Sequence, residues 1–400
     1  MQVLFTTLRN ASHFLPLIPF ISACRRRGHE VAVAAPPDVA ERVAATGASF
    51  FPFGHPGDEG LGPLWGRLRG ASEEESMRIS IGEIFAGACA GAALPGLLET
   101  ISRWRPSIII RESQEYAGLI AAQKVQIAHA RVAISAPSGE AQMVPYAAAP
   151  VDLHGRAAGL PPDSSGERLI RETALTLFPA SLELEAEAAA PVLRFRATRK
   201  EAPPLPQWWG ARQGPFVYVT LGTVVGGFDM MRSTYRTVLD AVADLPIRVL
   251  LTVGADLPLD ALGEVPPHVH VERFLPQDDV IPHAAAVICH GGSGTVLGTL
   301  AAGVPMVVAP LFADQPFNAA RVAATGAGIA LPTRGTSAAA VREALSQVLA
   351  DGSAQGSFGQ AARKIAKEIS ELPSIDDAPL EIERLARLPL NAGKNLADRG

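Results

Sequence analysis

The chain has 400 residues, of which 48% are hydrophobic and 19% are charged, and its formal net charge is −5. This composition is typical of a folded, soluble protein and excludes an intrinsically disordered one. The sequence has no basic stripe, which argues against nucleic acid as a partner, and its length predicts two domains or three.

Short apolar strands alternate with helices in the first part of the chain, a pattern that predicts βαβ units and a parallel sheet. Residues 137–166 contain prolines at intervals, and we expect a loop there. The expected strands cover 2–8, 29–35, 49–53, 107–111 and 130–135, and the expected helices cover 14–27, 38–46, 94–104 and 116–123, with helical pieces near 73–90.

The same alternation begins again after residues 199–214, which are rich in charge, proline and glycine and are interpreted as a linker. The sequence therefore predicts an α/β protein with a first domain over 1–198, a second over 215–375, and a helix and tail over 376–400 that pack back on the first. In the second domain we expect strands over 216–221, 248–253, 269–274, 286–289 and 305–309, a helix that ends at residue 302, and helices over 229–245, 314–324, 336–350 and 356–372.

Two domains of this kind are expected to meet over a cleft, because parallel sheets bind ligands at the carboxyl ends of their strands. Three loops at predicted strand ends carry unusual side chains: 9–13, 111–115 and 290–295.

The loop HGGSGT follows a predicted strand and begins a predicted helix. Backbone amides at a helix N-terminus bind phosphate, and a neighbouring histidine adds a hydrogen-bond donor. We therefore predict a phosphate site, although a glycine-rich turn without a ligand has the same pattern. The glycine spacing is neither the dinucleotide fingerprint nor a P-loop. The residues of this loop are His290, Gly291, Gly292, Ser293, Gly294 and Thr295.

Polar side chains at Asp314, Gln315 and Asn318 follow the strand of residues 305–309. A carboxylate accepts two O–H bonds, and an amide both donates and accepts, so Asp314 and Gln315 suit vicinal sugar hydroxyls. The alternative is that they only cap a helix.

His13 follows the first predicted strand, and Glu112 ends the strand SIIIRE of the same sheet. The ends of parallel strands can be neighbours, and a carboxylate on one imidazole nitrogen fixes the tautomer and raises the basicity of the ring. Such a pair would deprotonate an alcohol. Glu115 is the competing partner, although at the start of a helix it also compensates the helix dipole.

No D-x-D motif occurs, so we expect no metal clamp on a diphosphate and no cofactor. Cys24, Cys89 and Cys289 are odd in number and form no C-x-x-C pair, which predicts reduced thiols. The N-terminus lacks the features of a signal peptide, and the apolar run at 14–24 is too short to cross a bilayer. We therefore expect a cytoplasmic protein without stable membrane insertion.

The segment 289–326 resembles the donor-binding signature of glycosyltransferase family 1. It contains HGGSGT, a GVP turn, a strand that ends in proline, the pair DQ, and N-A-x-R. Upstream, RFLPQ at 273–277 is similar to the base-binding loop of the family, and SHFLPLIPFISACRRRGHEV near the N-terminus is similar to its opening H-x-x-P…GHEV. The resemblance extends over the whole chain and points to the actinobacterial type that glycosylates polyketides, macrolides and other antibiotics.

The resemblance implies a GT-B fold: two facing Rossmann-like domains with parallel sheets and an interdomain cleft. The N-terminal domain would bind the acceptor and the C-terminal domain the nucleotide sugar. It further implies an inverting, metal-independent transfer from a UDP- or TDP-sugar to an acceptor hydroxyl, which gives a β-glycoside.

The family's residue roles carry over position by position. His13 would be the catalytic base and Glu112 its partner, where the family often has aspartate, and Ser12 stands where the family usually has glycine. Residues 290–295 and Thr223 would bind the diphosphate. Phe274, Leu275 and Gln277 would bind the base of the nucleotide, and Asp314 and Gln315 would bind the sugar.

The acceptor is expected over residues 60–90 and 137–150, where Trp65, Phe85, Met143 and Tyr146 offer an apolar surface unless they belong to the core. We expect a lipophilic acceptor and a monomer or homodimer. One alternative is a non-catalytic relative that stabilises another enzyme; it should lack His13 or His290, and both are present. The other is a sugar-nucleotide epimerase of the same fold, which would need no acceptor.

Overall fold

The structure is a computed structural model, and it describes residues 1–68, 70–185, 189–199, 201–206, 214–222, 229–254, 257–350 and 356–388. Two compact units are present. The first comprises Met1–Leu177, Leu184–Thr198 and the segment that begins at Pro373, and the second comprises Phe178–Glu183 and Arg199–Leu372.

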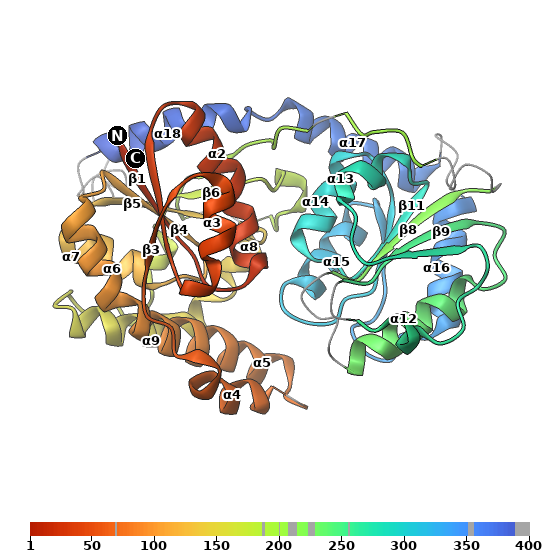
Figure 1. Cartoon of the computed structure of the whole chain (residues 1–400), viewed down its shortest axis with the longest axis horizontal. Coiled ribbons are helices and arrows are strands. Elements are labelled where there is room, and N and C mark those ends of the chain that lie inside the picture. The colour runs from red at the N-terminus through yellow and green to blue at the C-terminus, as the bar shows by residue number, and fades with distance from the viewer. Residues whose placement is uncertain are drawn as a thin grey trace. The chain divides into compact units, whose positions relative to one another are not determined.

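A seven-stranded parallel sheet forms the centre of the first unit, in the order β3-β2-β1-β4-β5-β6-β7 (Figure 1). Its strands are β1 (Gln2–Thr6), β2 (Glu30–Ala35), β3 (Ser49–Pro52), β4 (Ile108–Glu112), β5 (Ala128–Val132), β6 (Ala174–Thr176) and β7 (Val192–Arg194). The central strands read as continuous apolar runs because helices bury both faces of the sheet.

Alternate residues of β1 point to the two helical layers of this unit. Val3 and Phe5 lie in a cluster with side chains of α2 (Ile18–Arg26), α3 (Ala40–Thr46) and α18 (Ala378–Arg387). Leu4 lies in a second cluster, with α6 (Ala90–Trp104), α7 (Ala117–Val125) and α9 (Val144–Ala157). The C-terminal helix α18 therefore completes the core of the N-terminal sheet (Figure 1).

Shorter helices occupy several of the connections between the strands of this unit. The π-helix η3 runs directly into α6, and together with α5 they form a helix over Glu73–Trp104 that is long and apolar enough to cross a membrane. Its apolar side chains pack in the core of the unit, so it is a core helix. The bounds of the shorter helices are α1 (Ala11–Phe14), α4 (Gly57–Arg67), α5 (Glu73–Met77), η3 (Arg78–Cys89), α8 (Pro137–Ala141) and α10 (Glu167–Ile170).

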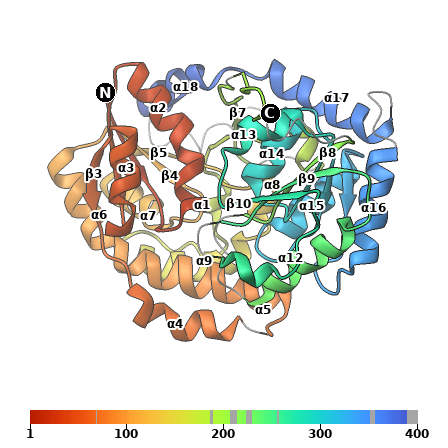
Figure 2. The ribbon, with the colours of Figure 1, turned by 45° about the vertical axis from the view of Figure 1, so that its right-hand side comes forward.

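The second unit has a six-stranded parallel sheet in the order β10-β9-β8-β11-β12-β13. Its strands are β8 (Phe216–Thr220), β9 (Arg248–Thr252), β10 (Val269–Glu272), β11 (Ala286–Cys289), β12 (Met306–Val308) and β13 (Gly328–Ala330). Helices α12 (Asp229–Val242) and α16 (Ala338–Ala350) lie side by side on one face (Figure 2). Among the described residues of this unit, the other α-helices are α13 (Gln277–Val280), α14 (Ser293–Ala301), α15 (Gln315–Ala324) and α17 (Ser357–Glu371).

The prediction of a loop over 137–166 is wrong for the first two thirds of this segment, where the chain forms α8 and α9. Pro137 and Pro145 stand in the first turns of these helices, where the missing N–H of proline costs no intrahelical bond. Pro150 lies inside α9. Prolines in this segment therefore stand at helix starts and within a helix, and a count of prolines in the sequence does not distinguish these positions from a loop.

Candidate active site

Three of the predicted site residues lie at the ends of strands that border the topological switch point of a sheet. In the first sheet this point lies between β1 and β4, and in the second between β8 and β11. Connections leave such neighbouring strands in opposite directions and leave a crevice at their carboxyl ends, which is where ligands of α/β sheets bind. His13 follows β1, Glu112 is the last residue of β4, and His290 follows β11.

The structure brings His13 and Glu112 together in the first unit. Nδ1 of His13 lies 2.9 Å from Oε1 of Glu112, and their residues are 7% and 0% exposed. Because a carboxylate only accepts, the proton of this bond belongs to Nδ1. The other nitrogen, Nε2, has no hydrogen-bond partner within the described part of the chain, so its lone pair is available to a hydroxyl.

The turn after β4 holds the Glu112 carboxylate in place. Its second oxygen, Oε2, accepts a hydrogen bond from the main-chain N–H of Gln114 at 2.7 Å. The Gln114 side chain in turn contacts the sulfur of Met143 at 3.0 Å. Met143, one of the expected acceptor contacts, is therefore connected to the dyad through one residue.

Glu115 occupies a different place from Glu112. Its carboxylate accepts hydrogen bonds from the Thr6 hydroxyl and from the amides of Ala117 and Gly118, at the start of α7. Burial raises the pKa of Glu115 to about 7, although the Thr6 bond and the charge of Arg111 act in the opposite direction. This carboxyl group supports the first turn of α7 and makes no contact with His13 among the described hydrogen bonds.

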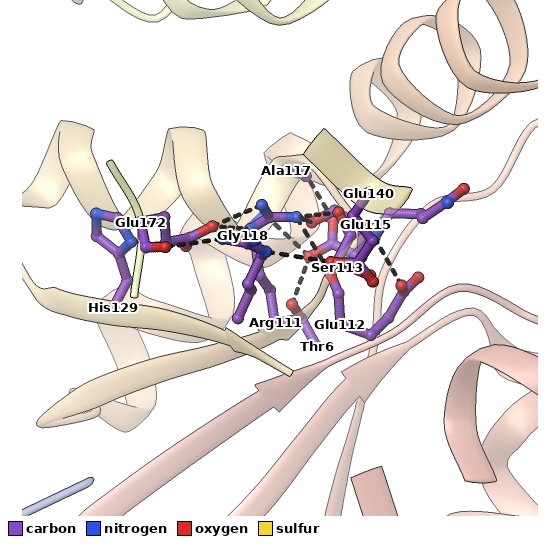
Figure 3. A network of polar contacts seen from close by, with 12 residues as sticks. Thr6, Arg111, Glu112, Ser113, Glu115, Ala117, Gly118, His129, Glu140 and Glu172 are labelled. Carbon is purple, nitrogen blue, oxygen red and sulfur yellow. Dashed lines mark hydrogen bonds and ion pairs between the residues drawn. The ribbon is translucent and has the colours of Figure 1, made fainter. Parts of the chain in front are cut away.

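A network of buried polar contacts surrounds Arg111 and includes Glu112 (Figure 3). Arg111, which is 1% exposed, contacts Glu172, and Glu172 also contacts His129. Burial alone would raise the pKa of Glu172, but Arg111 and His129 outweigh it and lower that pKa to about 2. The sequence analysis missed these residues. Their only signal is an arginine that directly follows the apolar run Ile108–Ile110 in a buried strand.

Aromatic side chains lead from His13 toward the surface. The ring of Phe85 lies edge-on to the His13 ring, with centroids 5.4 Å apart, and Trp65 lies 6.2 Å beyond Phe85. Trp65 is 39% exposed. Phe85 belongs to the π-helix η3, a rare element that is frequent at functional sites. Tyr146, at the start of α9, packs in the core cluster.

In the second unit, glycines make room for the imidazole of His290. Gly291 has φ of +88°, a conformation that favours glycine. A Cβ on Gly292 would lie 2.5 Å from Nε2 of His290, and one on Gly222 would lie 2.9 Å from the same atom. The HGGSGT loop thus packs tightly around one ring before α14 begins.

The His290 ring is neutral near pH 7, and one of its nitrogens has no hydrogen-bond partner among the described residues. Burial lowers its pKa to about 4, and a main-chain hydrogen bond involving Thr220 only partly opposes this shift. Its Nδ1 atom is buried and has no hydrogen-bond partner in the described ranges. A buried polar atom without a partner is costly, so this nitrogen is a candidate contact for an incoming ligand.

Asp314 is hydrogen-bonded to the HGGSGT loop. Its Oδ2 accepts from the Ser293 hydroxyl at 2.5 Å and from Nδ2 of Asn318 at 2.9 Å. It stands at the N-cap of α15 but makes no side-chain capping bond. The preceding Ala313 has φ of +56°, an uncommon conformation for a residue other than glycine and one that is often found at functional sites.

Gln315 and Asn318 have structural contacts that the sequence did not reveal. Oε1 of Gln315 accepts from the amides of Leu311 and Phe312 at 2.9 and 3.2 Å, so only its NH₂ group is left for a ligand. Nδ2 of Asn318 donates to the Gly291 carbonyl at 2.9 Å. The i, i+4 spacing of Asp314 and Asn318 on a helix was the available signal.

Two of the expected base-binding residues lie in the loop between β10 and α13, and Gln277 is the first residue of α13. Phe274 is 64% exposed and Leu275 is half-buried. Gln277 connects this loop to α14: its Oε1 accepts from the Thr295 hydroxyl at 3.1 Å, and its Nε2 donates to the Gly294 carbonyl at 3.2 Å. Thr223, the other expected diphosphate contact, lies outside the described residues.

Within the described ranges, no group of three or more His, Cys, Asp or Glu side chains is placed to hold a metal ion. The described candidates to contact a diphosphate are His290 and the backbone amides at the start of α14.

Comparison with known proteins identifies related chains. Residues 236–384 match the model of the erythromycin biosynthesis protein CIII-like C-terminal domain. The chain is 30% identical to the elloramycin glycosyltransferase of Streptomyces olivaceus, over 98% of this chain and 100% of that protein. It is 28% identical to the tylactone mycaminosyltransferase of Streptomyces fradiae, over 98% and 94%.

Solved structures show the same fold. The glycosyltransferase VinC, solved in complex with dTDP, aligns with a TM-score of 0.76 at 25% identity and covers 96% of this chain and 99% of its own. This likeness, with the two parallel sheets flanked by helices, confirms the expected GT-B fold class.

Proposed function

The chain belongs to glycosyltransferase family 1, among the glycosyltransferases of antibiotic biosynthesis, and from this premise we propose its substrates and mechanism. The donor is a TDP-sugar, in preference to a UDP-sugar. The acceptor is a hydroxyl of a lipophilic polyketide, macrolide or aromatic aglycone. The bound dTDP of VinC and the tylactone acceptor in the name of the Streptomyces fradiae relative support this choice.

The observation that carries the proposal is the His13–Glu112 pair at the switch point of the first sheet. With Nδ1 donating to Glu112, Nε2 of His13 takes the proton of the acceptor hydroxyl as the oxygen attacks the anomeric carbon. Glu112 holds the ring in this tautomer and stabilises the imidazolium that forms. Phe85 and Trp65 form an apolar wall beside the base and favour a lipophilic acceptor.

The bond between the anomeric carbon and the diphosphate oxygen breaks as the new bond to the acceptor oxygen forms. The nucleoside diphosphate leaves from the opposite face, so an α-linked donor gives a β-linked product. The amides at the start of α14 and the helix dipole stabilise the departing charge without a metal. His290, whose pKa burial lowers to about 4, donates to the diphosphate from the ring nitrogen that faces it and carries the proton.

We also assign the reaction to the cytoplasm. Cys24, Cys89 and Cys289 are free and buried, as is usual for proteins of a reducing compartment.

The test is a product screen in which TDP- and UDP-sugars are crossed with lipophilic aglycones and the products are analysed by mass spectrometry and NMR. We expect an aglycone glycoside with a β-linkage from an α-linked donor. A new sugar nucleotide formed without any acceptor would instead identify an epimerase. A protein that turns over no pair, yet activates a second glycosyltransferase, would be an auxiliary subunit.

A further inference from the structure

Arg111 is a fully buried cation whose side chain ends at the turn that carries Glu112. It is the penultimate residue of β4, between the apolar run Ile108–Ile110 and Glu112. Its Nε and Nη2 donate to the same oxygen of Glu172, at 2.9 and 2.6 Å. The other oxygen of Glu172 contacts Nδ1 of His129 at 2.8 Å, which fixes the carboxylate from its far side (Figure 3).

The third nitrogen of Arg111 holds the turn that carries Glu112. Nη1 donates to the carbonyl oxygens of Glu112, Ser113 and Glu115, at 3.2, 2.6 and 3.3 Å. These carbonyls converge on one nitrogen, so the guanidinium fixes the path of the backbone from 112 to 115. The rigid fork of arginine can bind a carboxylate on one side and carbonyls on the other, which the single ammonium of lysine cannot reproduce.

The turn fixed in this way determines where the Glu112 carboxylate lies. One of its oxygens is bound by the Gln114 amide of the same turn, and the other is left to meet His13. We propose that Arg111 and Glu172 are positioning residues of the transfer reaction: they orient Glu112, and through it the His13 imidazole. This inference rests on the proposed role of His13 as base.

A purely structural role for the Arg111–Glu172 pair makes different predictions. Buried ion pairs often add little net stability, and damage to one lowers stability wherever in the fold it lies. If the pair has a positioning role, its substitution lowers activity only because Glu112 is displaced. Asp152 offers a matched control because it is a buried carboxylate of the same unit, 6% exposed, that pairs with Arg156 at 3.1 Å and lies outside the turn.

The experiment compares Glu172→Gln and Asp152→Asn in two backgrounds, the native chain and Glu112→Gln. In the native background we expect Glu172→Gln to lower kcat about 10- to 100-fold, the scale of a misplaced catalytic group, with little change in the KM for the donor. In the Glu112→Gln background the same change should cost less than about twofold, because residues that act as a unit are non-additive. Asp152→Asn should leave kcat within about twofold in both.

A spectroscopic readout tests the inference without turnover. The Nδ1 proton of His13, held against the Glu112 carboxylate, should give a downfield resonance in the native protein and in Asp152→Asn. This resonance should broaden or disappear in Glu172→Gln. Equal losses of kcat in both backgrounds, or an unchanged resonance in Glu172→Gln, would overturn the positioning role.

Two further arms keep the result interpretable. If Glu172→Gln yields no folded protein, His129→Ala removes one contact to Glu172 at a less buried position and should give a smaller loss in the same direction. Normal turnover of His13→Ala would refute the proposed role of His13 as base. The proton resonance, compared between the native protein and Glu172→Gln, would still report whether Arg111 and Glu172 orient the His13 ring.

Discussion

Asn318 donates a hydrogen bond from Nδ2 to the Gly291 carbonyl, 2.9 Å away, and so joins helix α15 to the loop that begins α14. The same amide group reaches Oδ2 of Asp314. The proposed sugar-binding carboxylate and the proposed diphosphate loop are therefore held by one side chain. Substitutions at these two positions should separate the two parts of donor recognition.

Asp314→Ala should weaken binding of the TDP-sugar more than binding of TDP, which has no sugar to lose and is affected only through the bond between Asp314 and Ser293 of the loop. Asn318→Ala should weaken both, because the loop loses its connection to α15. Each lost contact to a buried group is expected to cost about 1–3 kcal/mol, roughly 5- to 150-fold in affinity. Calorimetric titration of each variant with TDP and with the TDP-sugar measures the difference. An Asp314→Ala protein that melts earlier but keeps its donor profile would leave only a stabilising role for Asp314.

His13→Ala should lower kcat by ~10²–10⁴-fold, the range for loss of a general base. Glu112→Gln keeps the shape of the side chain but removes its charge, and its loss should be smaller and parallel. Neither change should alter TDP affinity, because both residues belong to the first unit and the diphosphate loop to the second. Initial rates with saturating donor test this, and near-normal turnover of His13→Ala would remove it from the mechanism.

Gly292→Ala should weaken TDP binding strongly, because the added Cβ would lie 2.5 Å from Nε2 of His290 and must displace the ring. Gly294→Ala, two residues further on, is the matched comparison: nothing lies within 4 Å of its would-be Cβ. Its effect should be the smaller one, since the backbone amides remain in place. Fluorescence or calorimetric titration with TDP compares the two, and equal affinities would show that the position of His290 does not matter for binding.

Glu115 predicts a specific dependence of stability on pH. Burial raises its pKa from 4.5 to about 7, so between these values the folded state holds a proton that the unfolded state has released. The contribution of Glu115 to the free energy of unfolding should therefore fall as pH rises from about 4.5 to 7 and level off above.

Glu115→Gln should remove this component of the pH slope, which urea unfolding between pH 4.5 and 8 would measure. The exposed Glu99 gives the control, because its side chain is 60% exposed and Glu99→Gln should leave the slope unchanged. Parallel pH profiles of the native chain and Glu115→Gln would contradict the prediction.

Transfer should survive EDTA, because the proposed stabilisation of the diphosphate comes from the amides of α14 and from His290. Rates measured with EDTA and after addition of Mg²⁺ or Mn²⁺ decide this. Complete loss in EDTA with recovery on metal addition would refute the proposed charge stabilisation.

The central strands and the pairing of His13 with Glu112 were within reach of sequence reasoning. An apolar run such as that of β4 reads as a buried strand, and parallel strand ends meet at one edge of a sheet whatever their separation along the chain. The pairing follows from the strand order, in which β1 and β4 are neighbours.

The buried contacts that support Glu112 could not be predicted from the sequence. Arg111 and Glu172 are 61 residues apart, and the segment around Glu172 has no periodic pattern. The helix α9 was missed because proline at a helix start and proline in a loop look alike without the fold around them. Short-range signals therefore predict the elements, whereas the buried ion pairs depend on tertiary packing.

The short segment Phe178–Glu183 belongs to the second unit, although residues of the first unit flank it on both sides. Arg321 of α15 donates to the main-chain oxygens of Ser181 and Leu182, and Glu368 of α17 accepts from the Ser181 amide. A hybrid enzyme joined to a relative at the linker would thus inherit this segment from the wrong parent. Exchange of the donor half for one with another sugar preference needs two grafts: the half itself and the segment that packs against α15 and α17.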